Sequence, residues 1–149
     1  MAVTATPIFP QTPYSKSLSM AAQTACTTRA PTATASLSGA NIVAFVPTST
    51  NGLRIDSIQV NAVGTSVTTA NAANLVGIWA HDGTTAYLIL EIVVSAVTPN
   101  TTTTPAFTTV YTFPAPLVLP AAYSLYASVT VTTTATGTAL QATAFGGAY

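Results

Sequence analysis

The sequence predicts an all-β protein folded as an antiparallel β-sandwich of about eight strands. Apolar residues recur with a period of two along most of the chain, and clusters of Pro, Gly, Asn or Thr separate these runs at sandwich-like intervals. No segment longer than two turns carries a helical apolar stripe. A chain of 149 residues has the length of one domain, so a single core is expected.

The first 17 residues are predicted to form an extended arm, 1–17, ahead of a single sandwich domain, 18–149. Proline recurs at every third position in TPIFPQTP, which fixes φ, removes backbone donors and favours a polyproline-like segment. The arm carries three large apolar side chains, those of Ile8, Phe9 and Tyr14. We expect them to lie on an interface, formed either with their own domain or with a neighbouring subunit.

Runs of β-branched and aromatic residues predict the strands of the domain. They span residues 41–46, 53–62, 74–81, 86–94, 106–113, 123–131 and 138–145, with weaker runs near 18–26 and 30–37. In LRIDSIQVNAV, Leu53 and Ile55 alternate with polar residues, and then the phase shifts so that Ile58 and Val60 become the inward set. One extra residue near 56–57 would restore the register, which predicts a β-bulge there.

The stretch WAHDGTTAYLILEIVV contains the single Trp and the single His of the chain. Asp82 and Gly83 stand between two apolar runs, and Gly accepts the positive φ of a tight turn, so this stretch predicts a β-hairpin. Successive strand residues point to opposite faces, so His81 and Asp82 are not expected to act as a catalytic pair. We expect a turn histidine, an aspartate that binds turn amides, and Trp79 in the core near the turn.

Glu91 lies inside a strand that is apolar on both sides, and two roles are open for it. It is either an exposed edge-strand carboxylate that discourages edge pairing, or half of a structural ion pair across the sheet. Arg54 and Arg29 are the possible partners, and the pair Glu91 with Arg54 is the predicted one.

Composition excludes several functions. Charged residues make up 4% of the chain and the net charge is zero. Each charge therefore has roughly 1,200 Å² of surface around it, an area larger than the surface that one partner contributes to a standard protein interface. Three basic residues cannot neutralise the phosphates of a nucleic acid site, and no apolar run is long enough for a transmembrane helix. The chain has one His, one Cys and three carboxylates, so we expect no metal site, no cofactor and no enzymatic activity.

The chain also resembles a family. The TPIFPQTP arm, LRIDSIQV, the HDGT hairpin with its EI strand, LVLPAAYSLYAS and the terminal AFGGAY are similar to short proteins found among the head genes of tailed bacteriophages. Some of these look like jelly-roll cement or decoration proteins. The resemblance implies a jelly-roll sandwich that binds the outer surface of an icosahedral capsid and stabilises contacts between major capsid subunits. Its partners would be the major capsid protein and further copies of itself, as a dimer or trimer.

Such a protein would be made in the host cytoplasm and found on the virion surface. The alternative is a carbohydrate-binding or adhesin-like sandwich on the virion, and a tail or head-completion protein is a third possibility. The aromatic residues that bear on this choice are expected to fill the core or, alternatively, to form a sugar platform. They are Tyr111, Phe113, Tyr123 and Tyr126.

Overall fold

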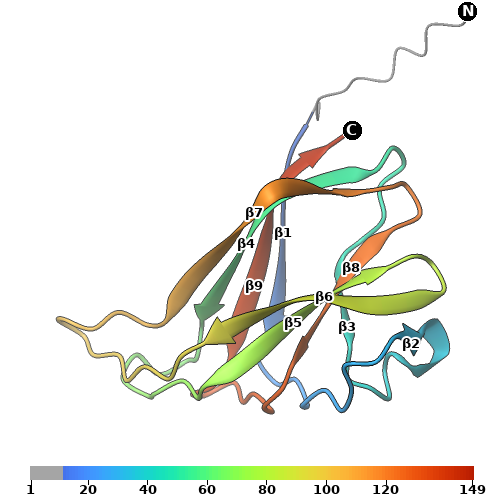
Figure 1. Ribbon diagram of the computed structural model, residues 1–149. Helices are drawn as coiled ribbons and strands as arrows, with labels where there is room; N and C mark the ends of the chain where they lie inside the picture. Colours follow the sequence, from blue (N-terminus) through green and yellow to red (C-terminus); the bar gives the residue numbers. More distant parts are fainter. Residues whose placement is uncertain (1–11) are drawn as a thin grey trace, which may run out of the picture.

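The computed structural model describes residues 12–149, which form two antiparallel sheets stacked face to face (Figure 1). The strands are β1 (Thr12–Met20), β2 (Thr32–Ala33), β3 (Val43–Val46), β4 (Leu53–Ala62), β5 (Asn74–His81), β6 (Thr85–Val94), β7 (Thr108–Leu119), β8 (Ser124–Val129) and β9 (Leu140–Ala148). One 3₁₀ turn, η1 (Thr34–Ser36), follows β2. The predicted antiparallel sandwich is confirmed, with nine strands where about eight were expected.

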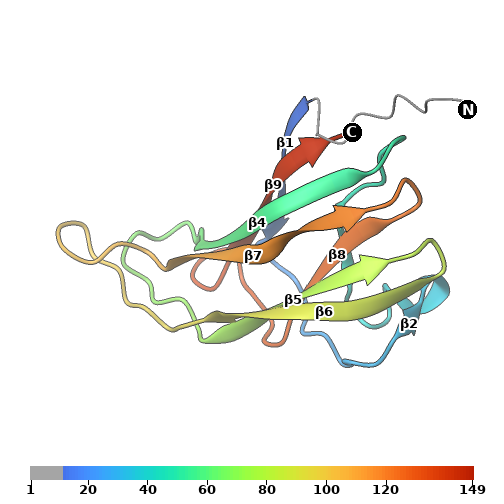
Figure 2. The ribbon, with the colours of Figure 1, turned by 45° about the horizontal axis from the view of Figure 1, so that its top comes forward.

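The strand order is that of a jelly roll. One sheet has the order β1-β9-β4-β7 and the other β2-β6-β5-β8-β3 (Figure 2). With the two-residue β2 set aside, eight strands remain. The first pairs with the last, the second with the seventh, the third with the sixth and the fourth with the fifth. This nested pairing arises when one long antiparallel hairpin wraps into two sheets, the arrangement of jelly rolls.

The main hydrophobic core fills the space between the sheets, and its largest fully buried side chains come from seven strands and include Ile58, Ile78 and Leu125. Trp79 is also buried, with 1% of its surface exposed, but it belongs to a second, smaller cluster. Because Ile78 and Trp79 are consecutive in β5, they point to opposite faces of the sheet. The small cluster therefore lies on the outer face of the five-stranded sheet, where the segment carrying η1 covers it.

The predicted bulge in β4 is confirmed. The register with β9 shifts between Ile55 and Ser57, so Asp56 is the extra residue in that pair. The register with β7 shifts at the same place, but there residues 113–116 of β7 are the unpaired ones. The bulge brings the carbonyl of Arg54 so close to Gly146 that any side chain at that position would collide with it. A second bulge, which the sequence analysis does not predict, lies in β6. There Ile89 is the extra residue, so Leu90 packs on the main core while Leu88 packs with Trp79.

The sheet begins within the predicted arm. Residues 12–17 are extended, as expected, but they form the first part of β1, which pairs with β9 along its whole length. Tyr14 is half-buried against the main core of its own domain. Its hydroxyl is buried without a hydrogen-bond partner among the described residues, and burial raises the pKa of this phenol. Ile8 and Phe9 lie outside the described residues.

Two other predicted elements differ in extent. The run predicted at 106–113 continues to Leu119, through Pro114 and Pro116. Proline is tolerated there because β7 is an edge strand, where a missing N–H leaves no partner unsatisfied. The weak run near 30–37 contains only β2 and then closes into η1.

Candidate functional site

The β5–β6 hairpin is held by one carboxylate. Asp82 Oδ1 accepts the backbone N–H groups of Thr84 and Thr85 and the Thr84 hydroxyl, each at 2.8 Å. Gly83 has φ of 98°, the left-handed conformation that the turn requires. The hydrogen bonds from Thr85 and Thr84 lower the pKa of Asp82 to about 2 because they stabilise its charged form. The prediction that Asp82 binds turn amides is confirmed.

His81, the last residue of β5, is buried beneath this turn, and its ring links the hairpin to η1. The Gly83 N–H donates to Nδ1 at 3.2 Å, so Nδ1 acts as an acceptor and Nε2 carries the proton. Nε2 then donates to the Thr34 hydroxyl at 2.9 Å, which donates in turn to the carbonyl of Thr84. Both ring nitrogens are therefore engaged in holding the turn.

The structure also brings a hydroxyl near this histidine, which sequence spacing could not reveal. Ser124 Oγ, at the start of β8, lies 3.5 Å from Nδ1 of His81. That distance is long for a hydrogen bond, and Nδ1 already accepts the Gly83 N–H. The Asp82 carboxylate faces the turn amides, so it does not orient the imidazole. An activated serine requires a free imidazole nitrogen and a group that orients the ring through its other nitrogen. Here Nδ1 accepts the Gly83 N–H, and Nε2 is bound to the Thr34 hydroxyl.

The predicted pair of Glu91 with Arg54 is wrong. Glu91 Oε1 binds Arg29 Nε at 2.8 Å, whereas Arg54 Nε binds Asp56 Oδ1 at 2.7 Å. Arg54 lies on β4 and Glu91 on β6, in different sheets, and both side chains point outward. The bulge at Asp56 instead places Arg54 beside its own neighbour. Arg29, the other possible partner, reaches Glu91 because its segment crosses the outer face of the five-stranded sheet.

A cleft of about 350 Å³ lies beside the Arg29–Glu91 ion pair. Its walls carry hydroxyls of three threonines and Ser128, the Cys26 thiol, Leu88 and the indole of Trp79. Trp79 Nε1 donates to Ser128 Oγ at 2.9 Å, so the buried indole has its polar group satisfied. The cleft combines hydroxyls with one opposite-charge pair, which is chemistry suited to a neutral polar group.

Buried polar side chains fix the loops at the end of the sandwich away from the hairpin. Asn74 accepts the N–H groups of Thr130 and Val131, both at 3.0 Å, and donates to the Val131 carbonyl. Asn71 joins the 63–73 loop to the next one through the Ser95 carbonyl and the Val97 N–H. These amides tie β5, β8 and two loops together. No motif in the sequence marked them, because their partners are backbone groups far away along the chain.

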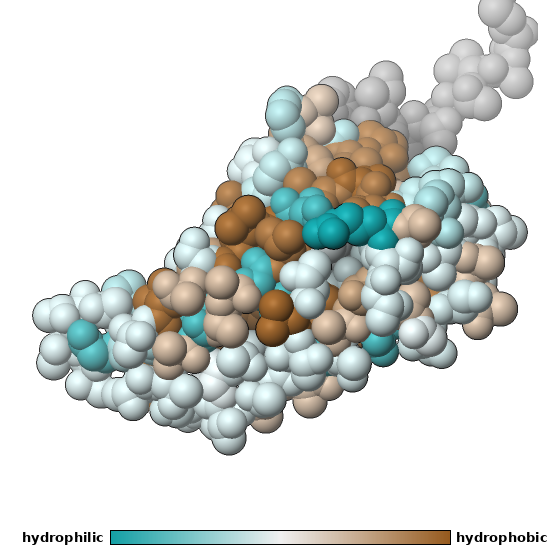
Figure 3. Space-filling view, turned by 60° about the horizontal axis from the view of Figure 1, so that its bottom comes forward, coloured by the Kyte–Doolittle hydropathy of each residue, from teal (hydrophilic) through white to brown (hydrophobic). Residues whose placement is uncertain are grey.

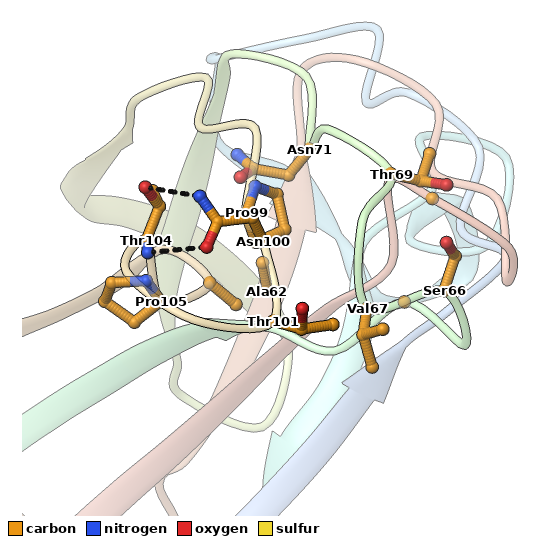
Figure 4. A pocket seen from close by; sticks show the side chains of 13 residues that line it. Ala62, Ser66, Val67, Thr69, Asn71, Pro99, Asn100, Thr101, Thr104 and Pro105 are labelled. Atoms are coloured by element: carbon orange, nitrogen blue, oxygen red, sulfur yellow. Dashed lines mark hydrogen bonds between the residues drawn. The ribbon is translucent and has the colours of Figure 1, made fainter.

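The same end holds a pocket of about 440 Å³ between three loops (Figure 4). Its lining is uncharged and free of aromatic rings, and consists of Ala62, Gly64, Ser66, Val67, Thr69, Asn71, Pro99, Asn100, Thr101, Thr104, Pro105, Ala106 and Gly137. Asn100 rigidifies the outermost loop, since its Oδ1 accepts the N–H groups of Thr102, Thr103 and Thr104. A neutral, preformed loop surface of this kind lacks the stacking groups typical of a sugar platform.

The aromatic side chains that could have formed such a platform instead pack against the two hydrophobic clusters. Tyr111, Phe113 and Tyr123 lie against the main core, and Tyr126 lies against the small cluster, with its ring 5.1 Å from that of His81. Tyr111 and Phe113 meet edge to face at 5.1 Å, which is a core geometry. All four are partly buried, so the expectation that they fill the core is met in part: three pack on the main core and Tyr126 packs on the small cluster.

Apolar groups gather in a band on one face of the molecule, with a few strongly hydrophilic groups set among them and a paler surface around (Figure 3). The most exposed large apolar side chains come from several elements: Val67, Val93, Val110, Val118, Val131, Tyr87 and Ile89.

Among residues 12–149, no three His, Cys, Asp or Glu side chains converge as metal ligands would. The described part of the chain also has no helix long and apolar enough to span a bilayer.

Comparisons with protein-family models, with curated proteins and with solved structures find no match to this chain.

Proposed function

We propose that this protein is a structural component of a bacteriophage virion, a cement protein that binds the outside of the capsid and stabilises contacts between major capsid subunits. One observation carries the proposal: a jelly-roll sandwich whose surface offers almost no free charge. The resemblance of the chain to short phage head proteins supports the same assignment.

The charged side chains are largely satisfied within the chain itself. Of the six, four form two internal ion pairs, and a fifth, Asp82, is bound by its own turn. Only Lys16 remains without an acidic partner among the described residues. A partner that covers this surface therefore desolvates few unpaired charges, which removes a large cost of association.

Broad neutral faces suit a protein that bridges others. Residues 92–149 contain no charged side chain, and they supply β7, β8, β9 and two of the loops at the pocket end. A standard interface needs about 800 Å² from each partner, and the sandwich offers several uncharged areas of that order. Contacts with two or three capsid subunits at once would resist their separation together, even where each contact is modest.

A carbohydrate-binding role is the second candidate, and the cleft beside Arg29 and Glu91 is what favours it. Hydroxyls, a guanidinium and a carboxylate around one hollow can bond sugar hydroxyls. Trp79, however, is almost fully buried, so it offers little face for a sugar ring to stack on. The cement role therefore accounts for more of the surface.

The two roles predict different losses when the protein is removed. Phage particles that lack it should assemble with normal geometry but release DNA at a lower temperature, and the purified protein should restore the difference. Thermal release followed by a DNA-binding dye measures this. If particles with and without the protein release DNA at one temperature while only complete ones adsorb to cells, the cement role is refuted and the adhesin role replaces it.

A further inference from the structure

A sandwich has strand edges that can pair with other chains, and three of the edges here are protected. β1 carries Lys16 opposite Ala144, a buried position, so this charge lies on the inward-facing register of an edge strand. β7 contains Pro114 and Pro116, and residues 113–116 have no partner in β4. β3 is only four residues long and has an irregular register. Charges, prolines and short strands are the usual means of preventing edge pairing.

The fourth edge, that of β6, is open over most of its length. β2 pairs only with Thr85 and Ala86 at one end, and the remaining residues of β6 have no strand on the side away from β5 (Figure 2). Three large apolar side chains are exposed there: Tyr87 at 45%, Ile89 at 42% and Val93 at 64%. The only charge on the strand, Glu91, is neutralised by Arg29 of the same chain. No proline interrupts β6.

We propose that this edge is a homodimer interface, in which β6 pairs antiparallel with β6 of a second copy across a twofold axis. An antiparallel strand edge is complementary to itself, so the same residues serve both sides of an isologous contact. Zero net charge on the chain removes repulsion between copies. The pairing would join two five-stranded sheets into one continuous sheet.

The bulge at Ile89 limits the pairing to the straight part of the strand, Leu90–Val94. Val93 is the most exposed side chain in that part, and it would be covered by the partner. A lysine at this position places a charge in a neutral contact where no acidic group is free to pair with it, since Glu91 is already bound by Arg29.

Val93→Lys tests the interface, with Val67→Lys as the matched control, because Val67 is exposed to 68% in a loop at the end of the sandwich. Val93→Thr is the conservative variant, since it keeps the branched shape without charge. Sedimentation velocity should be followed from about 1 to 200 µM, where small interfaces dissociate. Wild type, Val67→Lys and Val93→Thr should form dimers, and Val93→Lys should dissociate at least tenfold more readily. Circular dichroism melting verifies that each variant is folded.

Amide hydrogen exchange provides a second measurement. In the dimer, amides within Leu90–Val94 that face outward should become protected as the concentration of wild type rises, and this gain should be lost in Val93→Lys. A wild-type monomer across the whole range, or a Val93→Lys dimer of unchanged affinity, overturns the proposal. These experiments use purified protein without capsids, so their outcome is separate from that of the particle experiments.

Discussion

At the residue scale, the Asp82 carboxylate and the His81 imidazole stabilise one turn. Each forms hydrogen bonds to backbone or hydroxyl groups of the hairpin or of η1. Both residue types also occur in catalytic pairs, yet here each side chain is bound by different groups: Asp82 by the turn amides, and His81 by the Gly83 N–H and the Thr34 hydroxyl.

The depressed pKa of Asp82 predicts how stability should depend on pH. Its pKa in the folded protein, about 2, lies below the ordinary value of 3.8, so its contribution is complete above pH 3.8 and is lost as the pH falls through 2. Asp82→Asn keeps an oxygen acceptor but has no proton to gain. The difference in melting temperature between wild type and Asp82→Asn should therefore shrink from pH 5 to pH 2. A difference that stays constant over this range would show that the charge does not stabilise the turn.

At the scale of elements, two bulges decide where side chains go. The bulge at Asp56 lets apolar side chains of β4 point into the core both before and after it. The same bulge leaves no room for a side chain at position 146, where the chain has glycine. Ile89 divides β6 between the main core and the small cluster around Trp79. The first bulge is visible as a change of phase in the sequence. The second is hidden because β6 is apolar on both faces, so no alternation shows the shift.

The loop-binding amides predict a contrast between two asparagines. Asn74→Ala should destabilise the fold by about 2 kcal/mol, because it removes a buried amide that accepts the Val131 N–H and donates to the Val131 carbonyl, whereas the Thr130 N–H keeps the Leu75 carbonyl as an acceptor. Asn100→Ala removes three side-chain hydrogen bonds to the backbone, against four at Asn74, but from an exposed loop where water replaces them, so it should cost under about 1 kcal/mol. Urea denaturation of both variants gives the two values. Equal losses would mean that burial does not set the cost.

At the scale of the whole molecule, internal pairing of charge predicts how copies attract one another. Light scattering of concentrated protein should change less than about twofold between low and high NaCl, since screening acts on exposed unpaired charges. Ammonium sulfate should strengthen association markedly, because it favours burial of apolar surface. A strong decrease in association with NaCl would indicate that the remaining charges dominate the contacts.

Local pattern was sufficient to predict much of this protein. Alternation of apolar residues identified seven strands, Asp82 and Gly83 identified the hairpin, and the phase shift near Asp56 identified a bulge. These features depend on neighbours a few residues apart, where the geometry of a strand or turn leaves few choices. The low charge of the chain likewise required no structure to see.

Other features depend on which strands become neighbours, and only the tertiary structure decided them. The ion-pair partner of Glu91 is Arg29 rather than Arg54 because β4 and β6 belong to different sheets, and the segment after β1 crosses the outer face. The same crossing covers Trp79, while the nested strand order leaves β6 with an open edge. Contacts between residues 50 or 60 positions apart follow from the packing of the whole chain, and no short stretch of sequence encodes that packing.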